Sequence, residues 1–192
     1  MLLDFQATLE IKPEKAIKLE KDALAQIENI TADNARLVSN LHANLGGLYR
    51  MNGHPDLARE HMEKSISLLD QFNLLHINDS IPQIANYAMF LTEQQEPERG
   101  ISELQKLSSI IKEYHSDDCL DYAKVQETLA TIYLMTANLP QAKTHFKKAF
   151  KIYEKIWADE PEMIKAKYQE IQELYPQIGF CIGKNLSGLL TK

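Results

Sequence analysis

Prolines recur along this chain at an almost constant interval, and this period restricts its possible folds more than any other feature. Three are 42 residues apart and a fourth follows 43 residues later: Pro13, Pro55, Pro97 and Pro140. Small residues keep the same period, at Ala16, Ala58, Gly100 and Ala142. The prolines and the small residues thus keep the same period over four segments of the chain. This agreement predicts a repeat architecture, in which each repeat buries its apolar face against its neighbours.

Each repeat predicts a pair of helices. Proline is favoured in the first turn of a helix, where its missing amide hydrogen would have no partner, so each of these prolines should begin the second helix of a pair. Apolar residues follow at helical spacing, most clearly at Ala142, Phe146, Ala149, Tyr153 and Trp157. A similar stripe precedes each proline. Short polar residues predict N-caps for these first helices: Thr31 with Asp33, Asp79 with Ser80, and Ser116–Asp118.

The chain is therefore predicted to be all-α, with about four helix pairs and a C-terminal capping helix. We expect one domain over residues 1–192, made of a partial repeat (1–30), three full repeats (33–72, 80–114, 118–157) and a last helix with its cap (161–192). The cap is expected at 177–190, where glycines and Lys184 interrupt the repeat. Its apolar residues could instead pack on a second copy and form a homodimer.

Composition excludes several classes of partner. Asp and Glu number 27 against 21 Lys and Arg, a formal net charge of −6, which disfavours nucleic-acid binding. Cys119 and Cys181 form neither a CxxC motif nor a disulfide framework. No basic leader and no apolar run of ~20 residues is present. We expect a soluble cytoplasmic protein that acts without nucleic acid or membrane.

Two of the repeats resemble the tetratricopeptide repeat (TPR) family. The first contains the string Asn-Leu-Gly-Gly-Leu-Tyr at 44–49, then Ala58 and Ser65, and the third contains Leu-Ala-Thr-Ile-Tyr at 129–133. The resemblance covers roughly residues 33–175, and the 42-residue period is similar to that of the kinesin-light-chain-like subgroup, common in bacterial proteins. It implies a right-handed α-α superhelix, a TPR solenoid whose first helices line a concave face.

The resemblance implies that this concave face binds a peptide or a segment of a partner protein. The inward positions include Asn44 and Asn86, which are 42 residues apart and stand where the family often places an asparagine that holds a ligand's main chain. The alternative is that these asparagines only bridge neighbouring helices and that three methionines of the same helices, Met51, Met89 and Met135, fill half-buried space. The candidate partner-binding residues are Asn44, Gly47, Arg50, Met51, Asn86, Met89, Glu93, Lys124, Glu127, Thr128, Thr131 and Met135.

The predicted function is a non-enzymatic interaction scaffold. The alternative is the C-terminal peptide-sensing module of a bacterial transcription regulator that responds to signalling peptides. The two-carboxylate clamp of some TPR domains is rejected, because only Asn86 and Lys124 match its five positions, while Ala43, Gly47 and Thr128 do not.

Catalytic and metal-binding patterns are weak. Residues 115–121 (His-Ser-Asp-Asp-Cys-Leu-Asp) could supply zinc ligands, but helix capping explains their acids better, so no metal, cofactor or enzyme activity is predicted. His54 and His61 are interpreted as a turn residue and an exposed helix residue. A basic stripe could meet an acidic or phosphate surface, although the solvated outer face of a helix is favoured: Lys143, Lys147, Lys151 and Lys155, with Lys148 beside it.

Overall fold

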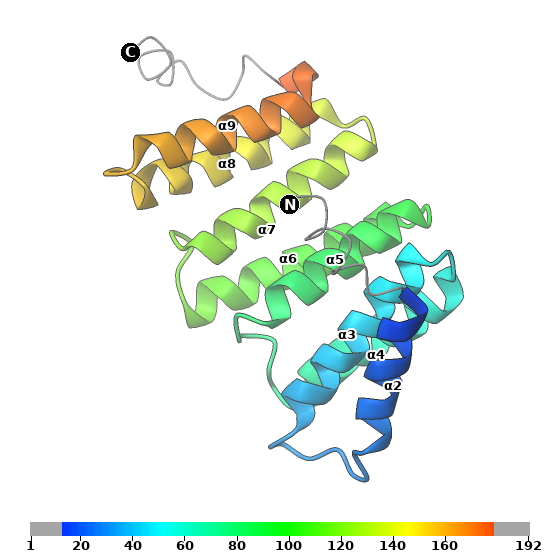
Figure 1. Cartoon of the computed structure of the whole chain (residues 1–192). Coiled ribbons are helices and arrows are strands. Elements are labelled where there is room, and N and C mark those ends of the chain that lie inside the picture. Colours follow the sequence, from blue (N-terminus) through cyan, green and yellow to red (C-terminus); the bar gives the residue numbers. More distant parts are fainter. Residues whose placement is uncertain (1–12, 179–192) are drawn as a thin grey trace, which may run out of the picture. The chain divides into compact units, whose positions relative to one another are not determined.

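The computed structural model describes residues 13–178, and every regular element in that range is a helix (Figure 1). The helices up to residue 93 are α2 (Pro13–Ala25), α3 (Ala35–Met51), α4 (Pro55–Gln71) and α5 (Ser80–Glu93). They are followed by α6 (Pro97–Tyr114), α7 (Leu120–Met135), α8 (Leu139–Ile156), α9 (Pro161–Leu174) and the 3-10 turn η1 (Pro176–Ile178). The chain divides into two compact units, 1–90 and 91–192, with the boundary inside α5.

Unit 1 is built around the hairpin of α3 and α4. The partial repeat, α2, packs along α3, but none of its 13 residues is buried. The core lies between the facing stripes of α3, α4 and the first part of α5, which the sequence period predicted. Its members include Val38, Leu45, Met62, Leu69, Ile84 and Ala88.

Unit 2 is built around the hairpin of α7 and α8, with α6 packed on α7 and α9 packed on α8. The predicted stripe of α8 is confirmed at four positions, since Ala142, Phe146, Ala149 and Tyr153 are at most 1% exposed. Trp157 is an exception: it is the C-cap residue of α8, is only half-buried, and stacks on Tyr153 with ring centroids 4.8 Å apart.

The turn within each helix pair repeats one backbone conformation. Gly53, Gln95 and Ala137 are 42 residues apart and have φ angles of 76°, 65° and 57°. This left-handed region costs an ordinary residue about 1–2 kcal/mol, so only the first repeat has the residue best suited to it. The recurrence confirms that the 42-residue period is a structural period and not only a spacing of prolines.

The predicted N-caps are wrong in detail. Asn34, not Thr31 or Asp33, is the N-cap residue of α3. Cys119 is the N-cap of α7, where its Sγ accepts a hydrogen bond from the backbone amide of Tyr122 at 3.4 Å. Three of the acids that were expected to cap helices are instead paired with a lysine or an arginine of another helix: Asp79 with Arg36, Asp117 with Lys112 and Asp118 with Lys155.

The predicted capping helix at 177–190 lies outside the described residues, apart from the turn η1. The single-domain assignment of 1–192 and the homodimer through the C-terminal segment stay predictions. Within residues 13–178, no helix combines the length and the apolar character needed to cross a membrane.

Two adjacent glycines of α3 should respond to alanine with opposite signs. A Cβ at Gly46 would lie 2.5 Å from Met62 Cγ and 3.3 Å from the carbonyl oxygen of Ala58, whereas one at Gly47 would meet nothing within 4 Å. Gly46→Ala should lower the free energy of unfolding by about 1–2 kcal/mol, because α3 and α4 must move apart. Gly47→Ala should raise it by about 0.5–1 kcal/mol through helix propensity. Urea denaturation measures both, and shifts of the same sign would contradict the packing argument.

Candidate functional site

Unit 1 contains a cavity of about 530 Å³ between α3 and α5, with α4 beneath it. We call it the α3–α5 cavity. Helix α3 contributes Asn40, Ala43, Asn44, Gly47, Arg50 and Met51 to its lining. The start of α5 contributes Pro82, Gln83 and Asn86, with Asp79 just before the helix, and α4 contributes Met62 and Ser65. Five of the predicted partner-binding residues therefore meet at one cavity.

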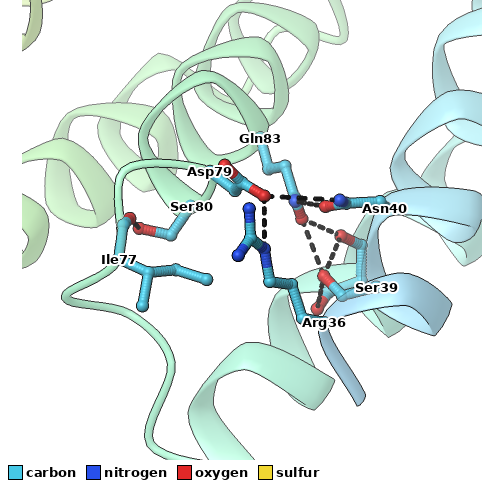
Figure 2. Close-up of polar contacts among 8 residues, drawn as sticks. Arg36, Ser39, Asn40, Ile77, Asp79, Ser80 and Gln83 are labelled. Atoms are coloured by element: carbon cyan, nitrogen blue, oxygen red, sulfur yellow. Dashed lines mark hydrogen bonds and ion pairs between the residues drawn. The ribbon is translucent and has the colours of Figure 1, made fainter. Parts of the chain in front are cut away.

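A network of side-chain amides and hydroxyls joins the three helices beside this cavity (Figure 2). Gln83 is its centre: its Oε1 accepts hydrogen bonds from the hydroxyls of Ser39 and Ser65, and its Nε2 donates to Asn40 Oδ1 at 2.6 Å. Two hydroxyl donors on one oxygen fix which way the amide points. The network thereby holds α5 against α3 and α4.

An ion pair closes one end of the network. Arg36 Nε lies 2.6 Å from Asp79 Oδ2, and Asn40 Nδ2 also donates to this oxygen at 3.4 Å (Figure 2). The hydrogen bond from Arg36 holds the pKa of Asp79 below its usual range, with a smaller contribution from Asn40. Asp79 therefore stays ionised and anchors the first turn of α5 to α3, instead of capping its own helix.

This network was not predicted from the sequence, although the repeat register contains a signal for it. Ser39 corresponds to Ile81 and Ala123 in the later repeats, and Gln83 corresponds to Val125. Polar residues at positions that are apolar in other copies mark a local departure from generic repeat packing. Buried polar side chains need hydrogen-bond partners, and in this network they hydrogen-bond to one another.

The two predicted asparagines of the α3–α5 cavity differ in the hydrogen bonds that their side chains make. Asn44 Nδ2 donates to Glu20 Oε1 of α2 at 2.9 Å, so one amide hydrogen is engaged while its Oδ1 is left to accept. Asn86 is exposed, and its side chain makes no hydrogen bond within residues 13–178. Its donor and acceptor both remain available to a ligand.

The other cavity candidates offer space and apolar contact. Gly47 leaves space free on the cavity side of α3, because a Cβ added at this residue would have no neighbour within 4 Å. Met51 is 80% exposed at the end of α3. Met89, by contrast, is half-buried on α5 and is absent from the cavity lining.

The remaining predicted site residues belong to unit 2. Glu127 is engaged in the fold: it accepts a hydrogen bond from Tyr153 at 2.6 Å and pairs with Lys167 at 2.9 Å. Lys124 pairs with Asp121 at 3.6 Å. The hydroxyls of Thr128 and Thr131 donate to carbonyl oxygens of their own helix, while Glu93 and Met135 are exposed. Their role in binding stays a prediction.

A histidine pair lies in the α3–α4 hairpin, so the interpretation of His61 as an exposed residue is wrong. Its Nδ1 is 2.8 Å from Nδ1 of His42, and its ring stacks on Tyr49 with centroids 5.4 Å apart. Burial, reinforced by the neighbouring imidazole and by Lys64, lowers the pKa of His42 to about 4. Burial is also the main cause of the lowered pKa of His61.

The third repeat contains the counterpart of this pair. His145, 84 residues after His61, stacks on Tyr133 at 5.3 Å, and its Nδ1 lies 2.9 Å from Oε1 of Gln126, which occupies the position of His42. Burial, with a contribution from Lys148, lowers the pKa of His145 to about 4. Both hairpins thus place an imidazole between a tyrosine ring and a polar side chain.

The cluster at 115–121 consists of surface ion pairs and a helix cap. Asp118 hydrogen-bonds to Lys155, and Asp117 lies 3.9 Å from Lys112. Asp121 forms its ion pair with Lys124, and the Ser116 hydroxyl accepts from the amide of Asp118. Between residues 13 and 178 no group of three or more His, Cys, Asp or Glu side chains is placed to hold a metal ion.

Comparison with known proteins supports the helical-repeat fold. Residues 80–155 match the family described as "Tetratricopeptide repeat", a family of typically non-enzymatic protein–protein interaction scaffolds. The chain is similar in structure to BtubC (BKLC) from P. vanneervenii, with a TM-score of 0.74 and 17% identity over 95% of this chain and 74% of that one. No curated protein gives a significant sequence match. The predicted all-α repeat fold is thus confirmed, and residues 80–155 are similar in sequence to the tetratricopeptide repeat.

Proposed function

We propose that this chain is a non-enzymatic interaction scaffold that binds an extended peptide, or a peptide-like segment of a partner protein, in the α3–α5 cavity. The observation that carries the proposal is that Asn44 and Asn86, equivalent residues of successive repeats, line one cavity together with Gly47. Its volume of about 530 Å³ falls within the range of pockets that enclose small ligands or a few side chains.

The lining suits a main chain with one apolar side chain. The side-chain amide of Asn86 has no partner among the described residues, so its donor and acceptor can pair with both polar groups of one peptide unit. Ala43, Gly47 and Met62 form an apolar floor beside it, and Met51 adds an adaptable contact at the rim. Asn44 contributes its acceptor, with its amide held in place by Glu20. We place the repeats in the 42-residue kinesin-light-chain-like subgroup, which the recurring turn conformation supports.

Asn86→Ala should weaken peptide binding without changing the free energy of unfolding. The loss should be about 1–2 kcal/mol, because one hydrogen-bond partner disappears and leaves a peptide group unpaired. Peptides selected from a random display library against the parent chain provide the ligand, and calorimetry gives the dissociation constant. Gln105→Ala, which truncates an exposed amide of α6 outside the cavity, is the matched control and should bind like the parent.

A second variant tests the cavity itself. Gly47→Leu should fill the cavity while preserving the helix, since nothing lies within 4 Å of the added Cβ. Selected peptides should therefore lose measurable binding to Gly47→Leu. Equal binding of these peptides by the parent and by a folded Gly47→Leu variant would exclude the α3–α5 cavity as the site.

A further inference from the structure

The outer face of α8 differs in charge from those of the other second helices. Helix α8 carries five lysines and a single acid, Glu154. Helix α4 carries four acids and two bases, and α6 carries three of each. A solvated face needs polar side chains of either sign, as α4 and α6 illustrate. Solvation alone therefore does not account for a face with five lysines and one acid in a chain whose formal net charge is −6.

The lysines form a continuous stripe opposite the buried face of the helix. Lys143, Lys147, Lys151 and Lys155 succeed one another at intervals of four residues, about 6 Å along the helix axis, and Lys148 lies beside them. The buried stripe, which includes Phe146, Phe150 and Tyr153, occupies the other side. All five lysines except the half-buried Lys143 are exposed.

Little negative charge within unit 2 compensates this stripe. Asp118 hydrogen-bonds to Lys155 and also feels the charge of Lys151. Within residues 13–178 no carboxylate lies at ion-pair distance from Lys143, Lys147, Lys148 or Lys151. Like charges four residues apart on a helix destabilise it, so the stripe carries a cost that an acidic partner would remove.

We propose that the lysine stripe of α8 is a docking surface for an acidic polypeptide segment of a partner protein. Carboxylates four residues apart on a helix repeat at the same interval of about 6 Å as the lysines, so an acidic helix can pair with every member of the stripe. The occupant and the surface are distinct from the α3–α5 cavity and its peptide.

Charge and side-chain type favour a polypeptide over other polyanions. The stripe is one helix wide, and a long nucleic acid or an anionic membrane would also meet the acidic remainder of the chain. Proteins that bind single strands combine basic residues with aromatic side chains on which bases stack. The aromatic side chains Phe146, Phe150 and Tyr153 of α8 are buried and present no such platform.

Binding of a fluorescein-labelled helical peptide with Glu at every fourth position, measured by anisotropy at physiological ionic strength, tests the proposal. The variant K143Q/K147Q/K148Q/K151Q should bind this peptide at least about tenfold more weakly than the parent, as expected when several exposed ion pairs are lost together. The control variant K15Q/K18Q/K64Q/K106Q removes four lysines from α2, α4 and α6. Both variants have a formal net charge of −10 (−6 minus 4), so nonspecific attraction is matched.

The proposal is supported if the control variant binds the peptide like the parent while the α8 variant loses affinity. The circular dichroism spectra of both variants should match that of the parent. An equal loss of affinity in both variants would show that net charge alone causes the effect and would overturn the proposal. Tighter binding of the parent to a duplex oligonucleotide or to phosphatidylserine vesicles than to the peptide would overturn it as well. Neither result bears on the α3–α5 cavity, because none of the eight substituted lysines lines it.

Discussion

Lowering the pH from 7 to 4 should destabilise the folded chain by on the order of 5 kcal/mol. The main cause is burial of histidines that the folded state keeps neutral. The pKa values of His42 and His145 are lowered from 6.5 to about 4, and the pKa of His61 is lowered as well. Equilibrium urea denaturation at a series of pH values measures this effect.

The direction of the change follows from which state takes up protons first. Between pH 6.5 and 4 the unfolded chain protonates His42 and His145, while the folded chain holds them neutral. Stability is therefore complete above pH 6.5 and is lost as the pH falls toward 4. The contact between Nδ1 of His42 and Nδ1 of His61 adds to this, because two imidazolium ions at 2.8 Å would repel each other.

His42→Gln tests whether the buried histidines cause the loss of stability at low pH, because it introduces a glutamine–histidine pair that the third repeat already contains. Gln126 occupies the equivalent position of the third repeat and is paired there with His145, so a glutamine at position 42 can pair with His61. The variant should keep its stability at pH 7 within about 1 kcal/mol. It should lose about 2 kcal/mol less than the parent on acidification, because one buried histidine has been removed.

His54→Gln makes the same chemical change at an exposed position and should follow the pH profile of the parent. A profile for His42→Gln that coincides with the profile of His54→Gln would show that the histidine pair is not the origin of the acid sensitivity.

The positions of the helices could be predicted because they follow from the period. A proline that recurs every 42 residues fixes where the second helices begin, and equivalent positions of successive first helices must lie near one another. The tetratricopeptide resemblance implied that Asn44 and Asn86 face inward at equivalent positions, and both residues line the α3–α5 cavity.

The caps and the polar network could not be predicted from the repeat, because partners distant in sequence decide them. Asp118 has the chemistry of an N-cap, but Lys155, 37 residues away, binds it, and the weak acceptor Cys119 takes its place. Asp79 is likewise bound by Arg36 of the preceding helix pair. A local propensity predicts what a side chain can do, whereas tertiary contacts determine which of its options it uses.

Glu127→Ala should lower the free energy of unfolding by about 3 kcal/mol. The Glu127 carboxylate accepts a hydrogen bond from Tyr153, which is 1% exposed, and pairs with Lys167, whose side chain is 20% exposed. Burial is the main cause of the raised pKa of Tyr153, followed by the charge of Glu127, so the phenol stays protonated and needs an acceptor. Truncation leaves a buried hydroxyl unpaired and removes one partner of a half-buried ammonium group.

Three further variants separate this structural role from partner binding by the same residue. Glu127→Gln retains an acceptor for the Tyr153 hydroxyl but removes one of the two carboxylates that pair with Lys167, the other being Glu170, so its loss of stability should be intermediate. Tyr153→Phe should cost less in the Glu127→Ala background than in the parent, because the hydroxyl it removes is then already unpaired. Asp121→Ala removes an acid of the same helix with a more exposed lysine partner, Lys124, and should cost less than about 1 kcal/mol. An unfolding curve for Glu127→Ala that matches Asp121→Ala would contradict the structural role and leave Glu127 available for a partner, as the sequence predicted.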